Sequence, residues 1–280
     1  MEKRITGNDD NMTNYIALDI DDAIVHPLAK SLSATFVTDG WKGLANYPIE
    51  DTVIFRSMTQ RKTVNICEAQ NRNYLYIDTG YIGNMQKRKD WHRVVSNGMQ
   101  HCNINWNLPN DRFNKLAIEK PYLRFPKWKK NGKAILLVTP SDKPCKFYGI
   151  NRDDFVSSTI ASIKQYTDRP IIIRDKVIRR ERVGLGSIYN QLDNDDIFAV
   201  VTYNSIAATE AIGYGVPCFT LAPNAADYFC EKDLSKIETP NYRDSEEVER
   251  WQNWIAYCQY HPIEMQNGTA ISLIKEYNLS

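Results

Sequence analysis

Residues Ile197-Phe-Ala-Val-Val-Thr-Tyr-Asn-Ser-Ile-Ala-Ala-Thr-Glu-Ala-Ile-Gly-Tyr-Gly-Val-Pro-Cys-Phe-Thr220 carry the strongest fold signal in this 280-residue sequence. The pattern predicts a buried strand over residues 197–201, a polar turn, and a short helix of small residues over 206–214. After a Gly-Val-Pro break it predicts a second strand over 216–221. Strand–helix–strand units of this kind build parallel sheets, so we expect an α/β protein.

The turn between this strand and this helix has the features of an anion-binding site. Asn204 or Ser205 is suited to cap the helix. A helix start at the carboxyl end of a parallel strand offers free backbone N–H groups and the positive end of the helix dipole to a phosphate. Glu210 follows one turn later, where its carboxylate can reach the hydroxyls of a bound ribose or sugar. The same strand and helix would also suit an α/β unit without a ligand.

The spacing of these residues is more specific than the elements themselves. The pattern Asn-Ser-x-Ala-Ala-x-Glu-Ala-x-x-x-Gly-x-Pro, beginning at Asn204, resembles the donor-binding segment of GT-B glycosyltransferases. It is especially similar to capsule-type, Kdo transferase-like enzymes and to glycosyltransferase-like proteins of tailed phages. The resemblance implies two Rossmann-like lobes with a cleft between them. It also implies that Ser205 and Thr209 lie near the diphosphate of a nucleotide sugar, and Glu210 near its ribose.

The composition is that of a folded protein with a sizeable core, since 42% of the residues are hydrophobic and 25% are charged. The sequence has no run of eighteen apolar residues and no apolar leader at its start, so we expect a cytoplasmic protein without membrane contact. For a phage-encoded chain this would be the host cytoplasm. The six cysteines lack C-x-x-C spacing, and we interpret them as reduced thiols rather than metal ligands.

The net charge of +1 hides a strong asymmetry. Residues 1–133 carry 20 basic and 14 acidic side chains (+6), and residues 134–280 carry 15 and 20 (−5). Residues 85–133 alone hold 12 basic and 3 acidic side chains (+9), interleaved with Trp91, Trp106 and Trp128. This composition is typical of a surface that binds a polyanion, and equally of a solvated charged face whose aromatic residues lie in the core.

The segment Tyr76-Ile-Asp-Thr-Gly-Tyr-Ile-Gly-Asn84 predicts a strand that ends in a carboxylate. Asp78 is followed by two glycines, so the backbone can approach a ligand closely, although Asp is also a common turn residue. An acceptor hydroxyl must lose a proton as it attacks, and Asp78 is our first choice for the base, with His92 the second. The other predicted acceptor contacts are Tyr81, Lys87, Arg88, Lys89, Trp91, Arg93 and His101.

The same segment, followed by Trp-His-Arg-x-x-x-Asn-Gly from Trp91, is similar to the amino-terminal signature of phage-encoded glycosyltransferase-like proteins. Some of these transfer sugars onto hydroxymethylated bases of phage DNA. The resemblance therefore implies a DNA acceptor as well as a transferase.

A second group of basic residues follows two predicted strands. The buried run at residues 134–138 leads into a loop with Ser141 and Lys143, and the run at 170–173 leads into Arg174 and Lys176. Parallel strands end at one edge of a sheet, and Arg and Lys are the usual phosphate ligands. The loop lacks the G-x-x-x-x-G-K-[ST] pattern of a P-loop. The predicted donor site comprises Ser141, Lys143, Arg174, Lys176, Asn204, Ser205, Thr209 and Glu210.

Other patterns predict strands over residues 34–38, 52–55, 63–67 and 73–77, a long connector over 102–133, and helices over 153–166, 188–192, 246–260 and 268–277. We expect an acceptor-binding lobe over residues 1–130. A nucleotide-sugar-binding lobe, with the C-terminal helices, would occupy residues 131–280.

The predicted activity is sugar transfer from a nucleotide-diphosphate donor to a hydroxyl. The first choice of acceptor is a 5-hydroxymethylated base in double-stranded phage DNA. A capsule or surface polysaccharide is the alternative acceptor, and a non-catalytic nucleic-acid-binding α/β protein is the alternative of another class. A UDP- or a CMP-type donor is equally compatible. We expect no metal and no other cofactor, because the helix dipole, Lys143, Arg174 and Lys176 can neutralise the leaving group.

Overall fold

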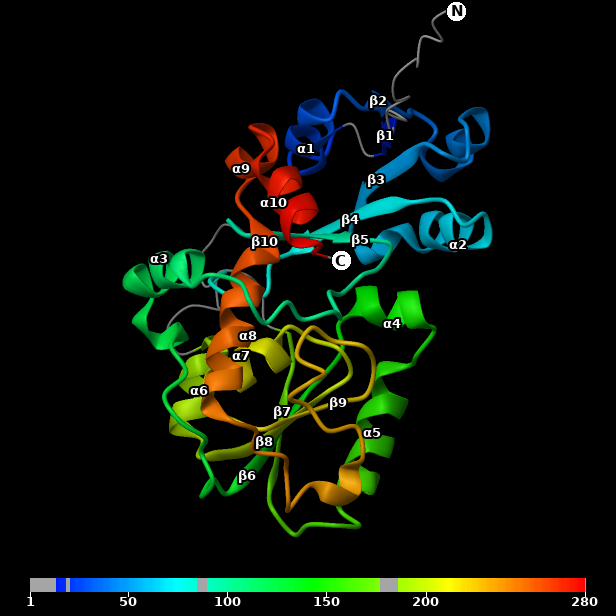
Figure 1. Ribbon diagram of the computed structural model, residues 1–280. Coiled ribbons are helices and arrows are strands. Elements are labelled where there is room, and N and C mark those ends of the chain that lie inside the picture. Colours follow the sequence, from blue (N-terminus) through cyan, green and yellow to red (C-terminus); the bar gives the residue numbers. More distant parts are fainter. Residues whose placement is uncertain (1–13, 19–20, 85–89, 177–185, 280) are drawn as a thin grey trace, which may run out of the picture.

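A computed structural model describes residues 14–18, 21–84, 90–176 and 186–279. Two β-sheets, each covered by helices, form two lobes that lie one above the other (Figure 1). This is the two-lobe α/β architecture predicted from the sequence. None of the described helices is long and apolar enough to cross a membrane.

The first lobe and the connector after it contain, in chain order, β1 (Tyr15–Ala17), α1 (Val25–Ser31), β2 (Thr35–Phe36), η1 (Gly40–Asn46), β3 (Thr52–Arg56), η2 (Met58–Gln60), α2 (Arg61–Ala69), β4 (Tyr74–Thr79), β5 (His92–Ser96), α3 (Asp111–Glu119) and η3 (Pro121–Leu123). Strands β1 to β4 pair in parallel. Strand β5 runs antiparallel to β4, so the sheet is mixed.

The second lobe contains β6 (Ala134–Val138), α4 (Asp142–Tyr148), α5 (Arg152–Ile163), β7 (Ile171–Arg174), α6 (Ile188–Asn194), β8 (Ile197–Thr202), α7 (Ala207–Gly213), β9 (Cys218–Thr220), η6 (Leu234–Lys236) and α8 (Ser245–Tyr257). Its four strands are all parallel, in the order β7-β6-β8-β9. Alternate residues of β6 face opposite sides: Ile135 and Leu137 pack with α5, and Leu136 and Val138 with α6 and α7. Burial on both faces explains why the strand reads as a continuous apolar run.

The C-terminal segment returns to the first lobe. It consists of β10 (Gln259–Tyr260), α9 (Pro262–Gln266) and α10 (Thr269–Tyr277). β10 extends the first sheet by pairing with β5, and α9 packs against α1 (Figure 1). The buried Gln259 side chain accepts the backbone N–H groups of Tyr81 (2.8 Å) and Ile82 (3.1 Å). The boundary at residue 130 stays a prediction. The C-terminal helices were grouped with the second lobe as helices that can pack back across the cleft, and α9 packs against α1 of the first lobe and α10 against α9.

Two predictions of local structure are wrong. Residues 63–67 lie in helix α2 and not in a strand, because Thr63, Val64 and Cys67 share one buried helical face. The predicted connector over residues 102–133 contains helix α3, whose buried face of Phe113, Leu116 and Ala117 packs against α8. In both segments polar residues interrupt the apolar spacing, and the packing partner lies far away in the sequence.

Local packing requires a glycine at the first position of the Gly-Val-Pro break. Gly215 has a φ of +80°, which favours glycine, and a Cβ atom at this position would clash with the carbonyl oxygen of Lys127. The Gly215 carbonyl accepts the backbone N–H of Lys129 at 2.7 Å. The chain that connects the two lobes is therefore held against the end of α7.

Candidate functional site

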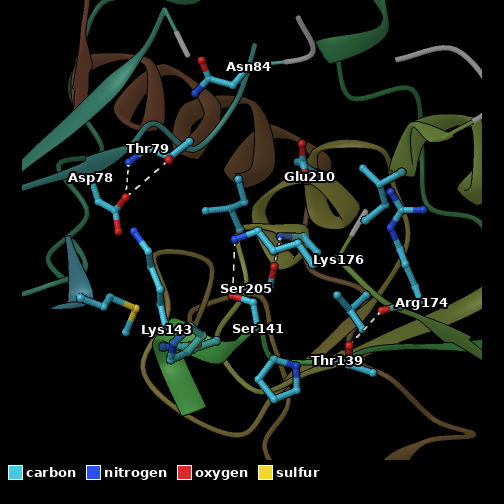
Figure 2. Close-up of a pocket in the computed structure, with 18 of the residues that line it drawn as sticks. Asp78, Thr79, Asn84, Thr139, Ser141, Lys143, Arg174, Lys176, Ser205 and Glu210 are labelled. Atoms are coloured by element: carbon cyan, nitrogen blue, oxygen red, sulfur yellow. Dashed lines mark hydrogen bonds between the residues drawn. The ribbon is translucent and has the colours of Figure 1, made fainter. Parts of the chain in front are cut away.

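A cavity of about 410 Å³ lies between the lobes, at the carboxyl ends of β6, β7 and β8. The first lobe contributes the end of β4, and the second lobe contributes the starts of α4 and α7. Asp78 and Arg174 lie on opposite sides of the cavity, with Lys143 and Ser205 between them (Figure 2). The predicted site residues that line it are Asp78, Arg93, Ser141, Lys143, Arg174, Lys176, Asn204, Ser205 and Glu210.

Three basic side chains reach this cavity from the second lobe. Lys176 Nζ lies 3.4 Å from Ser141 Oγ, and Lys143 Nζ donates to Ser57 Oγ of the first lobe at 3.0 Å. Arg174 donates to Gln191 Oε1 (2.7 Å) and to the carbonyl oxygen of Gly186 (2.8 Å). Arg174 therefore also fixes the segment that leads into α6, and with it this part of the cavity wall.

The charges of the described lining residues are nearly balanced. Arg93, Lys143, Arg174 and Lys176 contribute +4, and Asp78, Asp175 and Glu210 contribute −3, which leaves +1. Arg93 lies against Asp78, with 3.6 Å between Nη2 and Oδ2. The excess positive charge therefore belongs to the second-lobe side, where an anionic group would be held.

The turn between β8 and α7 is fixed by polar contacts. The Ser205 hydroxyl accepts the backbone N–H of Ala207 at 3.2 Å, but the N-cap residue is Ile206 and not Asn204 or Ser205, because the helix begins one residue later than predicted. The buried Asn224 side chain donates to the Ser205 carbonyl at 2.9 Å, and Asn204 donates to the Tyr148 hydroxyl at 3.1 Å. The wall formed by Asn204 and Ser205 is thus tied to α4 and to the loop after β9.

Thr209 does not line the cavity. Its side chain is buried, and its Oγ1 lies within hydrogen-bond distance of the carbonyl oxygens of Ile206 (2.7 Å) and Tyr81 (3.2 Å). The expected contact of Thr209 with a phosphate is therefore replaced by a structural link between α7 and the first lobe.

Asp78 is a firmly oriented carboxylate at the cavity wall. Its Oδ2 accepts the Tyr76 hydroxyl at 2.7 Å, and its Oδ1 accepts the backbone N–H of Thr79 at 2.7 Å. Burial, and then the charge of Asp78, raise the pKa of Tyr76 well above its usual value, so the phenol keeps the proton that it donates. Burial acts to lower the pKa of the Arg93 guanidinium, but the Asp78 carboxylate together with Tyr81, Tyr76 and Tyr148 outweighs this and raises it.

Tyr81, His92 and His101 lie in the core and not on the cavity wall. Tyr81 Oη and His101 Nδ1 are 3.0 Å apart, and both side chains are fully buried. Burial, together with the charge of Arg93, lowers the pKa of His101 to about 3, which keeps the ring neutral. His92, on β5, is 1% exposed. Direct contact of these three side chains with an acceptor is therefore not supported.

The aromatic residues of the basic segment are packed against the protein. The Trp91 ring lies 3.8 Å from that of His261, between ring centroids, and Trp91 does not line the cavity. Trp106 packs edge-on against Tyr228, and Trp128 donates its indole N–H to the Arg243 carbonyl. The acceptor contacts predicted for Lys87, Arg88 and Lys89 involve residues outside the described part of the chain.

Several residues of the lining were not predicted. Thr139, at the end of β6, donates to Asp175 Oδ1 at 2.7 Å and joins two strand ends. Asn84 forms two hydrogen bonds of 3.0 Å with the backbone of Trp91. The position of Asp175 between two predicted ligands was an available signal. Other lining residues that were not predicted include Met58, Thr79 and Gln100.

Among the described residues, no group of three or more His, Cys, Asp or Glu side chains is arranged to hold a metal ion. The prediction that the protein needs no metal is not tested by this observation. Any phosphate in the cavity would meet basic side chains directly.

No protein-family model matches the sequence, and no curated protein is significantly similar to it in sequence. The fold is similar to solved structures of KpsC from Thermosulfurimonas dismutans. The β-Kdo 2,7 transferase is 11% identical, with a TM-score of 0.53 and coverage of 94% of this chain and 99% of that chain. The β-Kdo 2,4 transferase is 14% identical, with a TM-score of 0.51 and coverage of 94% and 98%. The chain therefore has a two-lobe, GT-B-like α/β fold.

Proposed function

We propose that this chain is a glycosyltransferase that binds a nucleotide-sugar donor in the interlobe cavity. The observation that carries the proposal is the meeting of Lys143, Arg174 and Lys176 with the Ser205 turn, opposite the oriented Asp78. The similarity of the fold to two Kdo transferases supports it.

The donor half of the site matches the charge of a leaving nucleotide. As the bond between the sugar and the phosphate breaks, negative charge develops on the phosphate oxygen. Lys143, Lys176 and Arg174 can neutralise this charge. Glu210 lines the same cavity and is our proposed ligand of the ribose hydroxyls.

Asp78 is the proposed base. It takes the proton of an acceptor hydroxyl while the hydroxyl oxygen forms the new bond to the anomeric carbon, and the nucleotide leaves with the bonding electrons. Tyr76, Thr79 and Arg93 contact the carboxylate and hold it in one orientation. His92, the alternative base, is excluded from direct contact in this conformation by its burial.

A carbohydrate is the acceptor that we favour, as in a capsule or surface polysaccharide. The similarity to Kdo transferases is compatible with it. A 5-hydroxymethylated base in phage DNA is the second candidate, and the +9 charge of residues 85–133 favours it. The prediction of a DNA acceptor also relied on Trp106 and Trp128 as aromatic contacts for the DNA. Both side chains instead pack against other parts of the protein. Because a nucleotide sugar is the donor, we propose that the chain acts in the cytoplasm.

Release of free nucleotide from a panel of UDP-, CMP-, GDP- and dTDP-sugars tests this function. We expect slow hydrolysis of one donor by the protein, and faster release when an oligosaccharide mixture or hydroxymethylated duplex DNA contains the acceptor. The Asp78→Asn variant should lose this activity. Asp39→Asn, an exposed carboxylate outside the cavity, is the matched control. A folded protein that neither binds nor cleaves any of these donors would leave only the non-catalytic alternative.

A further inference from the structure

A second cavity, also of about 410 Å³, lies beside the first, within reach of Asp78. Its lining consists of the polar or charged residues Asp21, Asp22, Arg56, Ser57, Thr59, Gln60, Asp78 and Lys143. Asp78 and Lys143 line both cavities. A molecule in the second cavity can therefore reach the same carboxylate that faces a ligand in the first.

One side of the second cavity is rigid and electrically neutral. Asp22 Oδ2 and Arg56 Nη1 are 2.7 Å apart, and Asp22 Oδ1 accepts the backbone N–H groups of Ile24 (2.8 Å) and Val25 (3.2 Å). Burial acts to raise the pKa of Asp22, but the Ile24 N–H and the Arg56 guanidinium lower it below its usual value. This ion pair forms part of the cavity wall, and its two opposite charges cancel.

Ser57 lines the second cavity and contacts Lys143, which lines both cavities. Its φ of +79° and ψ of 144° belong to a region that favours glycine, so a serine is retained there at the cost of backbone strain. Its hydroxyl accepts the ammonium group of Lys143 at 3.0 Å, across the interlobe gap. The strained turn thus positions a hydroxyl in the lining of the second cavity, next to Lys143.

The lining indicates which chemical class can bind. Among the described residues of its lining, three carboxylates and two basic groups give a net charge of −1, which disfavours a polyanion. Neither cavity has an aromatic residue in its described lining, so an extruded base would find no aromatic stacking partner. Carboxylate, amide and hydroxyl groups together offer both donors and acceptors, which is what the hydroxyl groups of a sugar require.

We propose that the second cavity is the acceptor subsite and that it binds an uncharged saccharide through its hydroxyl groups. One of these hydroxyls is presented to Asp78 at the junction of the cavities. This inference rests on the proposed glycosyltransferase function, and it identifies the acceptor as a neutral carbohydrate rather than nucleic acid.

Saturation-transfer NMR titrations test the subsite without turnover. The probes are lactose and N,N′-diacetylchitobiose as neutral saccharides, glucuronic acid as a charged sugar, and a duplex containing 5-hydroxymethylcytosine. The variants are Asp21→Asn and Thr59→Val, with Asp39→Asn as the matched control outside the cavity. Each hydrogen bond that is lost or weakened should reduce the affinity about three- to tenfold.

We expect at least one neutral disaccharide to bind, both cavity variants to bind it more weakly, and the control to bind it unchanged. Glucuronic acid should bind at least about tenfold more weakly. Equal affinity of the cavity variants and the wild type, preference for glucuronic acid or DNA, or no binding of either disaccharide would overturn the proposal. Calorimetry of nucleotide binding on the same samples separates the proposed function from the proposed subsite. A protein that binds no nucleotide contradicts the proposed function. A protein that binds nucleotide but no saccharide contradicts only the subsite.

Discussion

Removing the ammonium group of Lys176 should weaken nucleotide binding by about tenfold. Lys176 Nζ lies 3.4 Å from Ser141 Oγ, at the edge of the cavity where the phosphates are proposed to lie. A hydrogen bond to a charged group contributes about 1.5–3 kcal/mol, and exposure of Lys176 to solvent favours the low end of this range. A loss of about 1.5 kcal/mol corresponds to a factor of about 12 in the dissociation constant.

Calorimetric titration of the Lys176→Ala variant with UDP and with CMP provides the measurement. The difference from wild type should shrink as salt is raised from 0.1 to 1 M, because the screening length falls from about 10 to about 3 Å. Lys133→Ala is the matched control, since this exposed ammonium group pairs with Asp196 (3.5 Å) outside the cavity. Wild-type affinity in a folded Lys176→Ala protein would refute the placement of the phosphates.

Glu210→Ala should weaken binding of a ribonucleoside diphosphate more than that of its 2′-deoxy analogue, and equal losses in titrations of the two would show that Glu210 does not contact the ribose. Asp78→Asn should reduce turnover by about 10²- to 10⁴-fold with nucleotide affinity unchanged, and near-normal turnover would exclude Asp78 as the base. His101 should make the free energy of unfolding fall by about 2 kcal/mol between pH 7 and pH 5. In the unfolded chain the His101 side chain takes up a proton near pH 6.5. In the folded protein its pKa is about 3, so protonation in this pH range stabilises only the unfolded chain. In urea titrations His101→Gln should show a correspondingly smaller fall than wild type, and an unchanged pH dependence would contradict this.

The second-lobe side of the cavity was largely predictable because its signals are local. An apolar run identifies a buried strand, and the polar residues that follow it must lie at the carboxyl edge of a parallel sheet. Strands β6, β7 and β8 each obey this rule, and Ser141, Arg174 and Ser205 accordingly line one cavity. No knowledge of distant contacts was needed to bring them together.

The first-lobe side of the cavity depends on contacts that local patterns do not contain. Tyr81 reads as an exposed residue beside glycines, yet its backbone N–H is bound by Gln259 and its ring is buried. His261 covers Trp91 in the same way. Both partners come from the C-terminal segment that returns to the first sheet through β10. An amphipathic pattern shows that a segment has a buried face, and it does not identify the surface that covers it.

A crystal structure of the protein soaked with UDP or CMP would show whether the interlobe cavity binds the nucleotide. We expect electron density for the nucleotide in this cavity, with phosphate oxygens within hydrogen-bond distance of Lys176 and the Ser205 turn and the ribose toward Glu210. A nucleotide bound elsewhere on the protein, with this cavity empty, would contradict this expectation.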